Sequence, residues 1–219
     1  MTEILTLLQR TELFESFSQD DIKQAILPYG QRKIHPKGSF LLEPQQQLDR
    51  FGVVLSGRIH ILHLFQDGSA SLTKVLTPGH ILGFDLICTR SRRAPYYAEA
   101  VLPTEVIYLP TELLTSPGLL PEPLRLHALN QLLLLVSQEN MKKEYRLAIL
   151  AQKGLRERIT TYLTMQAGRR GTQSFSIPFS RDELADFLCV NRSALSHELG
   201  NMRREGLIDF HKNSFTLYF

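Results

Sequence analysis

The spacing of apolar and polar positions changes along the chain. Residues 4–28 carry apolar side chains at helical spacing, and after Pro28 short alternating apolar runs follow. Turn signals such as Pro36-Lys-Gly and Thr77-Pro-Gly separate these runs. Strands that recur at roughly ten-residue intervals between turn residues are typical of a small sandwich or jelly-roll barrel. Within an α+β fold, we therefore expect a double-stranded β-helix barrel, preceded by short helices, over residues 1–120.

From Glu122 to about Leu150 the pattern becomes helical and rich in leucine. One side of this helix repeats at spacings of three and four, as a coiled-coil seam does. The seam, and the interface between two subunits that it predicts, comprises Leu126, Leu129, Leu133, Val136, Asn140, Lys143 and Leu147. Other leucines give the helix apolar surface off the seam. We expect residues 121–150 to serve both the barrel and a second subunit; the alternative is a helix that packs only on its own barrel.

Residues 151–219 predict a third part with two short helices joined by a tight turn. A helix over about Lys153–Ala167, a loop at Gly168–Gly171 and a strand from Ser174 precede them. Ser180 followed by Glu183 has the spacing of a capping box. The second short helix has a buried stripe, and two strands around a turn at residues 212–213 complete a winged helix-turn-helix. The stripe consists of Leu195, Leu199 and Met202.

The side chains between the stripe positions point away from it. All are hydrogen-bonding types, as reading base edges in a DNA groove requires. Arg192 is the strongest candidate for a base contact, because a guanidinium bridges the two acceptors of guanine. Other cations, among them Arg169 and Arg170, would hold phosphates without reading sequence. The predicted DNA-binding residues are Arg181, Asn191, Arg192, Ser193, Ser196, His197 and Lys212. The alternative is a helical hairpin whose polar face only meets water.

The charge of the chain is small but uneven. Net charge is +3 at pH 7, and the segment from Arg146 onward carries 11 Lys/Arg against 7 Asp/Glu. The basic excess thus lies in the part with the helix-turn-helix, as attraction to phosphates favours.

Several other classes of protein find no support. Cys88 and Cys189 are too few for a disulfide framework or a Cys-ligated cluster within one chain. His60 and His63, three apart on a strand, would point to opposite faces, so we expect no metal. No Ser/His/Asp order, phosphate loop or supported carboxylate pair is present, so we expect neither an enzyme nor a cofactor. With no apolar run of about 18 residues and no secretory signal, a cytoplasmic protein is expected.

A barrel, a long seam helix and a winged helix-turn-helix, in this order and at this length, resemble the Crp/Fnr family of bacterial transcription regulators. The similarity rests most on Leu55-Ser-Gly-Arg-Ile, Leu155-Arg-Glu-Arg-Ile-Thr-Thr-Tyr-Leu, and Arg181-Asp-Glu-Leu-Ala-Asp-Phe-Leu through Glu205-Gly-Leu-Ile. It implies a homodimer that senses a small effector in a cyclic-nucleotide-type barrel. Such a dimer binds a palindromic operator and recruits or blocks RNA polymerase.

The effector end departs from the pattern of members that bind cyclic AMP. In those members a Gly-Glu-Leu motif holds the ribose hydroxyl, and an Arg-Ser pair further on holds the cyclic phosphate. The matching stretches here are Gly83-Phe-Asp-Leu and Ala94-Pro95. A buried phosphate needs such a guanidinium partner, and Arg92 and Arg93 would supply one only if the loop shifted. We therefore expect an effector other than cyclic AMP.

The remaining hypothesis is an apolar or aromatic ligand, or an anion paired with Lys143, between barrel and seam helix. The predicted effector residues are Phe84, Asp85, Leu86, Tyr96, Tyr97, Asn140 and Lys143, with Glu144 beside them. Two alternatives stay open. The tyrosines are ordinary barrel packing and Lys143 is solvated, or the barrel binds nothing and only dimerises.

The resemblance also implies a mechanism. Each subunit sets its second short helix into a major groove, and the two grooves lie about 34 Å apart, one helical turn. An effector shifts the seam helices, and with them the two reading helices. Ser193 stands where members often carry Glu, and His197 where Arg is common, which argues against the family's consensus operator. The rival functions are a dimeric interaction protein that does not bind DNA and a cyclic-nucleotide-responsive regulator.

Overall fold

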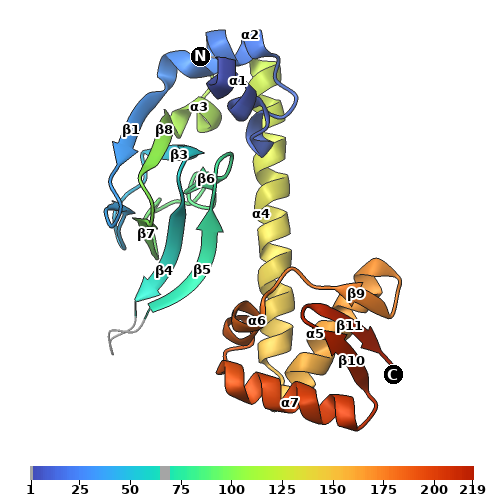
Figure 1. The fold of residues 1–219 in the computed structure, drawn as a ribbon. Helices are drawn as coiled ribbons and strands as arrows, with labels where there is room; N and C mark the ends of the chain where they lie inside the picture. The colour runs from blue at the N-terminus through green and yellow to red at the C-terminus, as the bar shows by residue number, and fades with distance from the viewer. Residues whose placement is uncertain (1, 65–69) are drawn as a thin grey trace. The chain divides into compact units, whose positions relative to one another are not determined.

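The computed structural model describes residues 2–64 and 70–219 (Figure 1). The chain divides into two compact units, Met1–Gln138 and Glu139–Phe219. Their boundary falls within α4 (Glu122–Leu150), the helix predicted over residues 121–150. Among the described residues, no helix is both long enough and apolar enough to cross a membrane.

The first unit contains two four-stranded antiparallel sheets with the orders β1-β8-β3-β6 and β2-β7-β4-β5. Buried side chains from the strands of both sheets meet in one core, and the predicted jelly-roll barrel is confirmed. The strands are β1 (Gln31–His35), β2 (Phe40–Leu42), β3 (Arg50–Ser56), β4 (Ile59–Leu64), β5 (Ala70–Leu76), β6 (Ile81–Leu82), β7 (Tyr97–Ala100) and β8 (Thr104–Pro110).

Short helical segments pack at one end of the sheets (Figure 1). Ser18 forms a capping box with Asp21, which starts the turns that lead to the first strand. Phe14 and Phe17 share one buried cluster with Ala128 of α4. The segments are α1 (Thr2–Gln9), η1 (Glu12–Phe14), α2 (Gln19–Asp21), η2 (Ile22–Ile26), η3 (Leu27–Tyr29) and α3 (Glu112–Thr115).

The turn of the Leu55-Ser-Gly-Arg motif requires its glycine. Gly57 has φ +88°, and a Cβ there would lie 2.4 Å from both the carbonyl oxygen of Pro103 and Oγ1 of Thr104. The Thr104 hydroxyl accepts a hydrogen bond from the Arg58 amide at 3.0 Å. The motif therefore joins the turn before β4 to the start of β8.

Two sides of α4 differ in burial. Ala128 and Leu132 are buried in the core of the barrel unit. Seam positions Leu126, Leu133 and Leu147 are 50%, 64% and 60% exposed. Val136 and Asn140 are also exposed and Leu129 is half-buried. If the helix packed only on its own barrel, this row of apolar side chains would stay exposed to solvent. Contiguous exposed apolar patches of this kind are uncommon on monomeric proteins and mark interaction surfaces.

The second unit is the predicted winged helix-turn-helix. Its three-stranded sheet has the order β10-β11-β9 and packs with the helices around a second core. Ile159, Tyr162 and Leu163 form the buried face of α5, as expected. The elements are α5 (Leu155–Arg170), β9 (Ser174–Ser176), α6 (Arg181–Phe187), α7 (Arg192–Arg204), β10 (Ile208–His211) and β11 (Ser214–Leu217).

One local prediction was wrong. The expected loop at Gly168 is helical, and α5 ends instead at Gly171, whose φ is +64°. A glycine within a helix costs only about 1 kcal/mol relative to alanine, so the helix continues through Gly168 to Arg170. Gly171 supplies the left-handed residue with which helices commonly end.

Candidate nucleic-acid interface

The two helices of the helix-turn-helix, α6 and α7, which together form the DNA reader, each begin directly after their predicted N-cap residue. The Glu183 carboxylate accepts a hydrogen bond from the Ser180 amide at 2.7 Å, and these hydrogen bonds lower the pKa of Glu183. Asn191 caps α7, since its side-chain oxygen accepts a hydrogen bond from the Ala194 amide at 2.7 Å. Between the helices lies the tight turn with Cys189, whose φ is +56°. Both predicted N-caps are confirmed.

The α7 helix has one buried and one polar side. Leu195, Leu199 and Met202 are fully buried against the second core. The predicted readers on the other side are exposed: Asn191, Arg192, Ser193, Ser196 and His197. These side chains are therefore available to an edge of a base pair in a groove wide enough for a helix.

The Arg192 guanidinium is held by a neighbour on α6. Its Nη1 lies 3.3 Å from Oδ2 of Asp182, with both side chains about two-thirds exposed. An exposed pair of this kind is weak, so it restricts the Arg192 side chain without making it unavailable. Asp182 was not among the predicted site residues, because it pairs with Arg192 ten positions away, across the turn.

Arg181 has a structural place as well as a charge. Its Nη2 donates to the Lys212 carbonyl at 3.0 Å, and its guanidinium lies 5.0 Å from the Phe210 ring centroid. Burial lowers its pKa. Arg181 thus fixes the tip of the wing to α6, and Lys212 is exposed at that tip.

The two arginines at the end of α5 are engaged with aromatic rings. Arg169 lies 4.1 Å from the Tyr145 ring centroid, and Arg170 lies 5.6 Å from that of Phe175.

Two family models match the chain in the order of its units. The cyclic nucleotide-binding domain matches residues 32–116, and the Crp-like helix-turn-helix domain matches residues 157–217. Together they account for about two thirds of the sequence. The chain belongs to the Crp/Fnr family. It is a DNA-binding transcription regulator of that type.

Curated relatives agree with this assignment. Electron transport regulator A of Shewanella oneidensis is 25% identical over 179 residues, which cover 79% of this chain and 69% of the relative. The fumarate and nitrate reduction regulatory protein of Escherichia coli is 25% identical over 178 residues, covering 78% and 68%.

Solved structures share the fold. The catabolite activator protein of Thermus thermophilus is 21% identical with a TM-score of 0.50, covering 94% of this chain and 93% of that one. The global regulator CLP of Xanthomonas campestris is 18% identical with a TM-score of 0.60, covering 92% and 100%. Crp/Fnr proteins bind DNA and function as dimers.

Part of the predicted effector set of this Crp/Fnr regulator lies together inside the barrel. Phe84, Leu86 and Tyr96 are buried, and the Tyr96 hydroxyl donates to Oδ1 of Asp85 at 2.8 Å. Burial, reinforced by the Asp85 charge, raises the pKa of Tyr96. The Tyr96 hydroxyl thus engages Asp85, which lies in the Gly83-Phe-Asp-Leu stretch.

Tyr97 does not belong to this group, which corrects one expectation. It pairs with Leu62 in the sheet, and its ring meets Phe40 at 5.2 Å on the side of β7 opposite to buried Ala98. Tyr96, the residue before β7, is buried, whereas Tyr97 lies on the side of the strand away from Ala98, so only Tyr96 of the two faces inward. Asn140 and Lys143 are exposed on the part of α4 in the second unit, and their role stays a prediction.

The two arginines considered as substitute phosphate ligands are occupied. Arg92 donates from Nη1 to the Thr111 hydroxyl at 2.8 Å and to Glu112 at 3.2 Å. Arg93 donates from Nη1 to the Gln45 carbonyl at 2.7 Å. Neither guanidinium replaces the missing Arg-Ser pair in this conformation.

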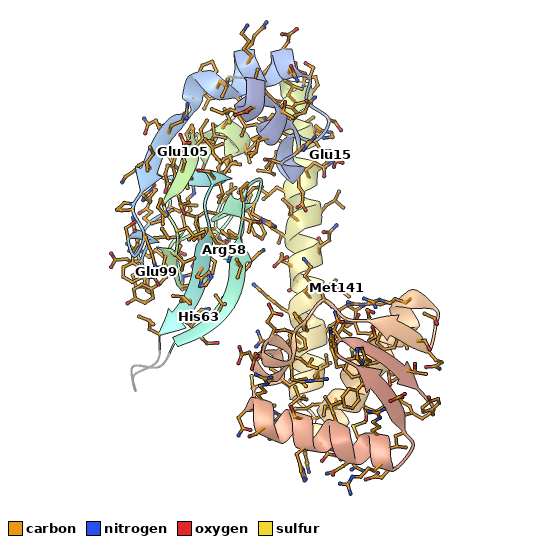
Figure 2. The ribbon with its side chains drawn as sticks, viewed as in Figure 1. Glu15, Arg58, His63, Glu99, Glu105 and Met141 are labelled. Carbon is orange, nitrogen blue, oxygen red and sulfur yellow. The ribbon has the colours of Figure 1, made fainter. Side chains whose placement is uncertain are left out.

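Two further polar residues join the inward-facing group. The Lys74 ammonium lies 4.7 Å from the Phe84 ring centroid. His63, labelled in Figure 2, meets the Tyr96 ring edge-on with centroids 6.4 Å apart. Neither Lys74 nor His63 was among the predicted effector residues, because a register shift between Ile61 and Leu62 breaks the simple alternation on these strands.

Proposed function

We propose that this regulator works as a homodimer, joined along the seam of α4, whose two α7 helices bind a palindromic operator. The observation that carries the proposal is the exposed polar side of α7, seated on a fully buried apolar stripe. Arg192, with Ser193, Ser196 and His197, would read base edges. Arg181 at the start of α6 and Lys212 at the tip of the wing would contact phosphates.

The exposed seam supports the pairing of two chains. Three of its leucines (Leu126, Leu133 and Leu147) and Val136 remain open to solvent within one subunit, while the barrel-facing side of the same helix is already buried. Covering such a stripe with its own copy is what a two-stranded coiled coil does. Asn140, at a seam position, would fix the register of the two helices.

Selection from a pool of random duplexes tests the DNA-binding proposal. We expect enrichment of an inverted repeat whose half-site centres lie about 34 Å apart, or one helical turn. Affinity for a random duplex should also fall steeply with salt, in proportion to the number of phosphates contacted. Enrichment of a single unrepeated site, or of no sequence, would contradict the proposed arrangement.

We further propose that the effector is a small aromatic or apolar molecule, with or without an acidic group, rather than cyclic AMP. The inward-facing group offers rings from Phe84 and Tyr96, a carboxylate from Asp85 and a cation from Lys74. With Arg92 and Arg93 engaged elsewhere, a cyclic phosphate would lack the bidentate partner that compensates its desolvation.

Thermal unfolding in the presence of cyclic AMP and of a set of aromatic acids tests the effector proposal. We expect stabilisation by at least one aromatic acid, which Tyr96→Phe weakens and Tyr97→Phe leaves unchanged. The second variant is the matched control, because its ring lies on the opposite side of β7. Stabilisation by cyclic AMP alone would favour the cyclic-nucleotide-responsive alternative.

A regulator of this kind acts on transcription where DNA and RNA polymerase meet. We therefore infer a cytoplasmic protein whose DNA-bound dimer recruits or blocks RNA polymerase. Transcription in vitro from a promoter that carries the selected repeat, with and without the protein, measures this effect and its sign.

A further inference from the structure

A single guanidinium joins the first turn of α5 to a carboxylate within α7 and to the carboxylate of the residue that follows α7. Arg156 Nε lies 2.6 Å from Oε1 of Glu198, while Nη1 and Nη2 lie 2.7 and 2.8 Å from the two carboxylate oxygens of Glu205. The contact to Glu205 is the parallel two-bond arrangement that gives arginine–carboxylate pairs their directional specificity.

Glu198 lies within α7, and Glu205, seven residues further on, caps its C-terminal end, so the two carboxylates lie about two turns apart along the helix. Arg156 therefore holds the helix both near its middle and just beyond its last residue. The buried stripe of α7 keeps the helix against the second core, but apolar contacts are not directional. The planar fork of Arg156 adds the directional restraint, fixing the rotation and axial position of α7 against α5.

The neighbouring arginine connects the same turn of α5 to other parts of the reader. Arg158 donates from Nε to the Gln152 carbonyl at 3.0 Å and from Nη1 to the Leu188 carbonyl at 3.2 Å. Gln152 lies in the connection from α4 to α5, and Leu188 caps the end of α6. Through Arg156 and Arg158, the start of α5 therefore contacts α7, the end of α6 and the connection between α4 and α5.

We propose that Arg156 is a positioning residue for operator recognition. It contacts no base, but it sets the orientation of α7, so that discrimination between operator and random DNA depends on its two-carboxylate contact. The inference rests on the proposed reading of base edges by α7. Base contacts require side chains to reach defined atoms in the groove, whereas phosphate contacts tolerate small rotations.

A purely electrostatic role predicts the opposite behaviour for one substitution. Glu205→Gln removes a negative charge from the winged unit, which by charge alone strengthens binding to every duplex. If Glu205 instead anchors the fork of Arg156, the same change lowers preference for the operator. Arg156→Lys tests the same distinction from the arginine side. It keeps the positive charge but loses the planar fork, so a charge effect alone leaves the preference for the operator unchanged.

The experiment measures the affinity of the full-length protein for the duplex enriched by the wild type and for a random duplex of equal length. For Glu205→Gln and Arg156→Lys we expect the ratio of the two affinities to fall on the order of tenfold. Binding of Glu205→Gln to the random duplex should be unchanged or stronger. Thermal unfolding of each variant shows whether the winged unit remains folded.

Asp209→Asn is the matched control. Like Glu205→Gln, it removes one carboxylate that pairs with an arginine, since Asp209 Oδ1 lies 2.8 Å from Arg203 Nε. Arg203 belongs to α7 itself, so this pair does not join α7 to α5. Its affinity ratio should match that of the wild type. An unchanged ratio in Glu205→Gln, or an equal fall in Asp209→Asn, would overturn the positioning role. A wild-type protein that enriches no sequence would instead overturn the proposed function beneath it.

Discussion

Truncation of one seam leucine provides a quantitative test of the proposed pairing. Leu133 is 64% exposed in the single subunit. Complete burial of a leucine side chain contributes about 1.5–3 kcal/mol, so covering its exposed part contributes about 1–2 kcal/mol. A two-fold axis repeats the contact, and Leu133→Ala should therefore cost about 2–4 kcal/mol of dimerisation free energy. The dissociation constant should rise about 30- to 700-fold.

Sedimentation equilibrium across a range of protein concentrations measures this constant. Leu134→Ala is the control, because Leu134 is 53% exposed on the same turn of α4 but off the seam. The two substitutions change the same residue type in the same helix, so helix propensity affects both equally. Equal weakening of the dimer by both variants, or an unchanged dissociation constant in Leu133→Ala, would contradict pairing along the seam.

Three further outcomes are expected. Arg192→Ala should remove about 1–3 kcal/mol of discrimination at one operator position; binding to duplexes mutated singly along the selected site measures it, and unchanged discrimination everywhere would exclude Arg192 as a reader. Cys189→Gly should raise the free energy of unfolding by about 0.5–1 kcal/mol, because glycine tolerates the positive φ there; urea denaturation that shows a loss would contradict this. Burial holds the pKa of His35 below its usual value. Stability should therefore fall as pH drops below about 6.5, since the unfolded chain binds the proton more readily. His35→Gln should make that decline shallower, and an identical decline would refute the assignment.

Short-range sequence patterns correctly predicted the two helices of the helix-turn-helix, α6 and α7. The Ser180 and Asn191 caps, and the stripe of Leu195, Leu199 and Met202, depend on spacings within a few residues, and the structure reproduces them. The α4 helix and the glycine turn at Gly57 follow for the same reason, because each is decided by its own segment of chain.

The details of the barrel interior were harder to predict. Tyr96 and Tyr97 are consecutive, and no sequence signal says which of them faces the core until the start and register of β7 are known. The register shift at Ile61 similarly hid the inward position of Lys74. Arg156 meets partners 42 and 49 residues away, a pairing that no periodicity along one helix encodes.

The α4 helix carries its barrel contact and its exposed seam on adjacent residues, Leu132 and Leu133. Each residue of an α-helix turns the chain by about 100°. A one-residue insertion or deletion between Leu133 and Leu147 would therefore carry the far part of the apolar stripe out of line with the near part. Among related genes, length changes within this segment should accumulate in whole heptads, while the loops between strands vary residue by residue.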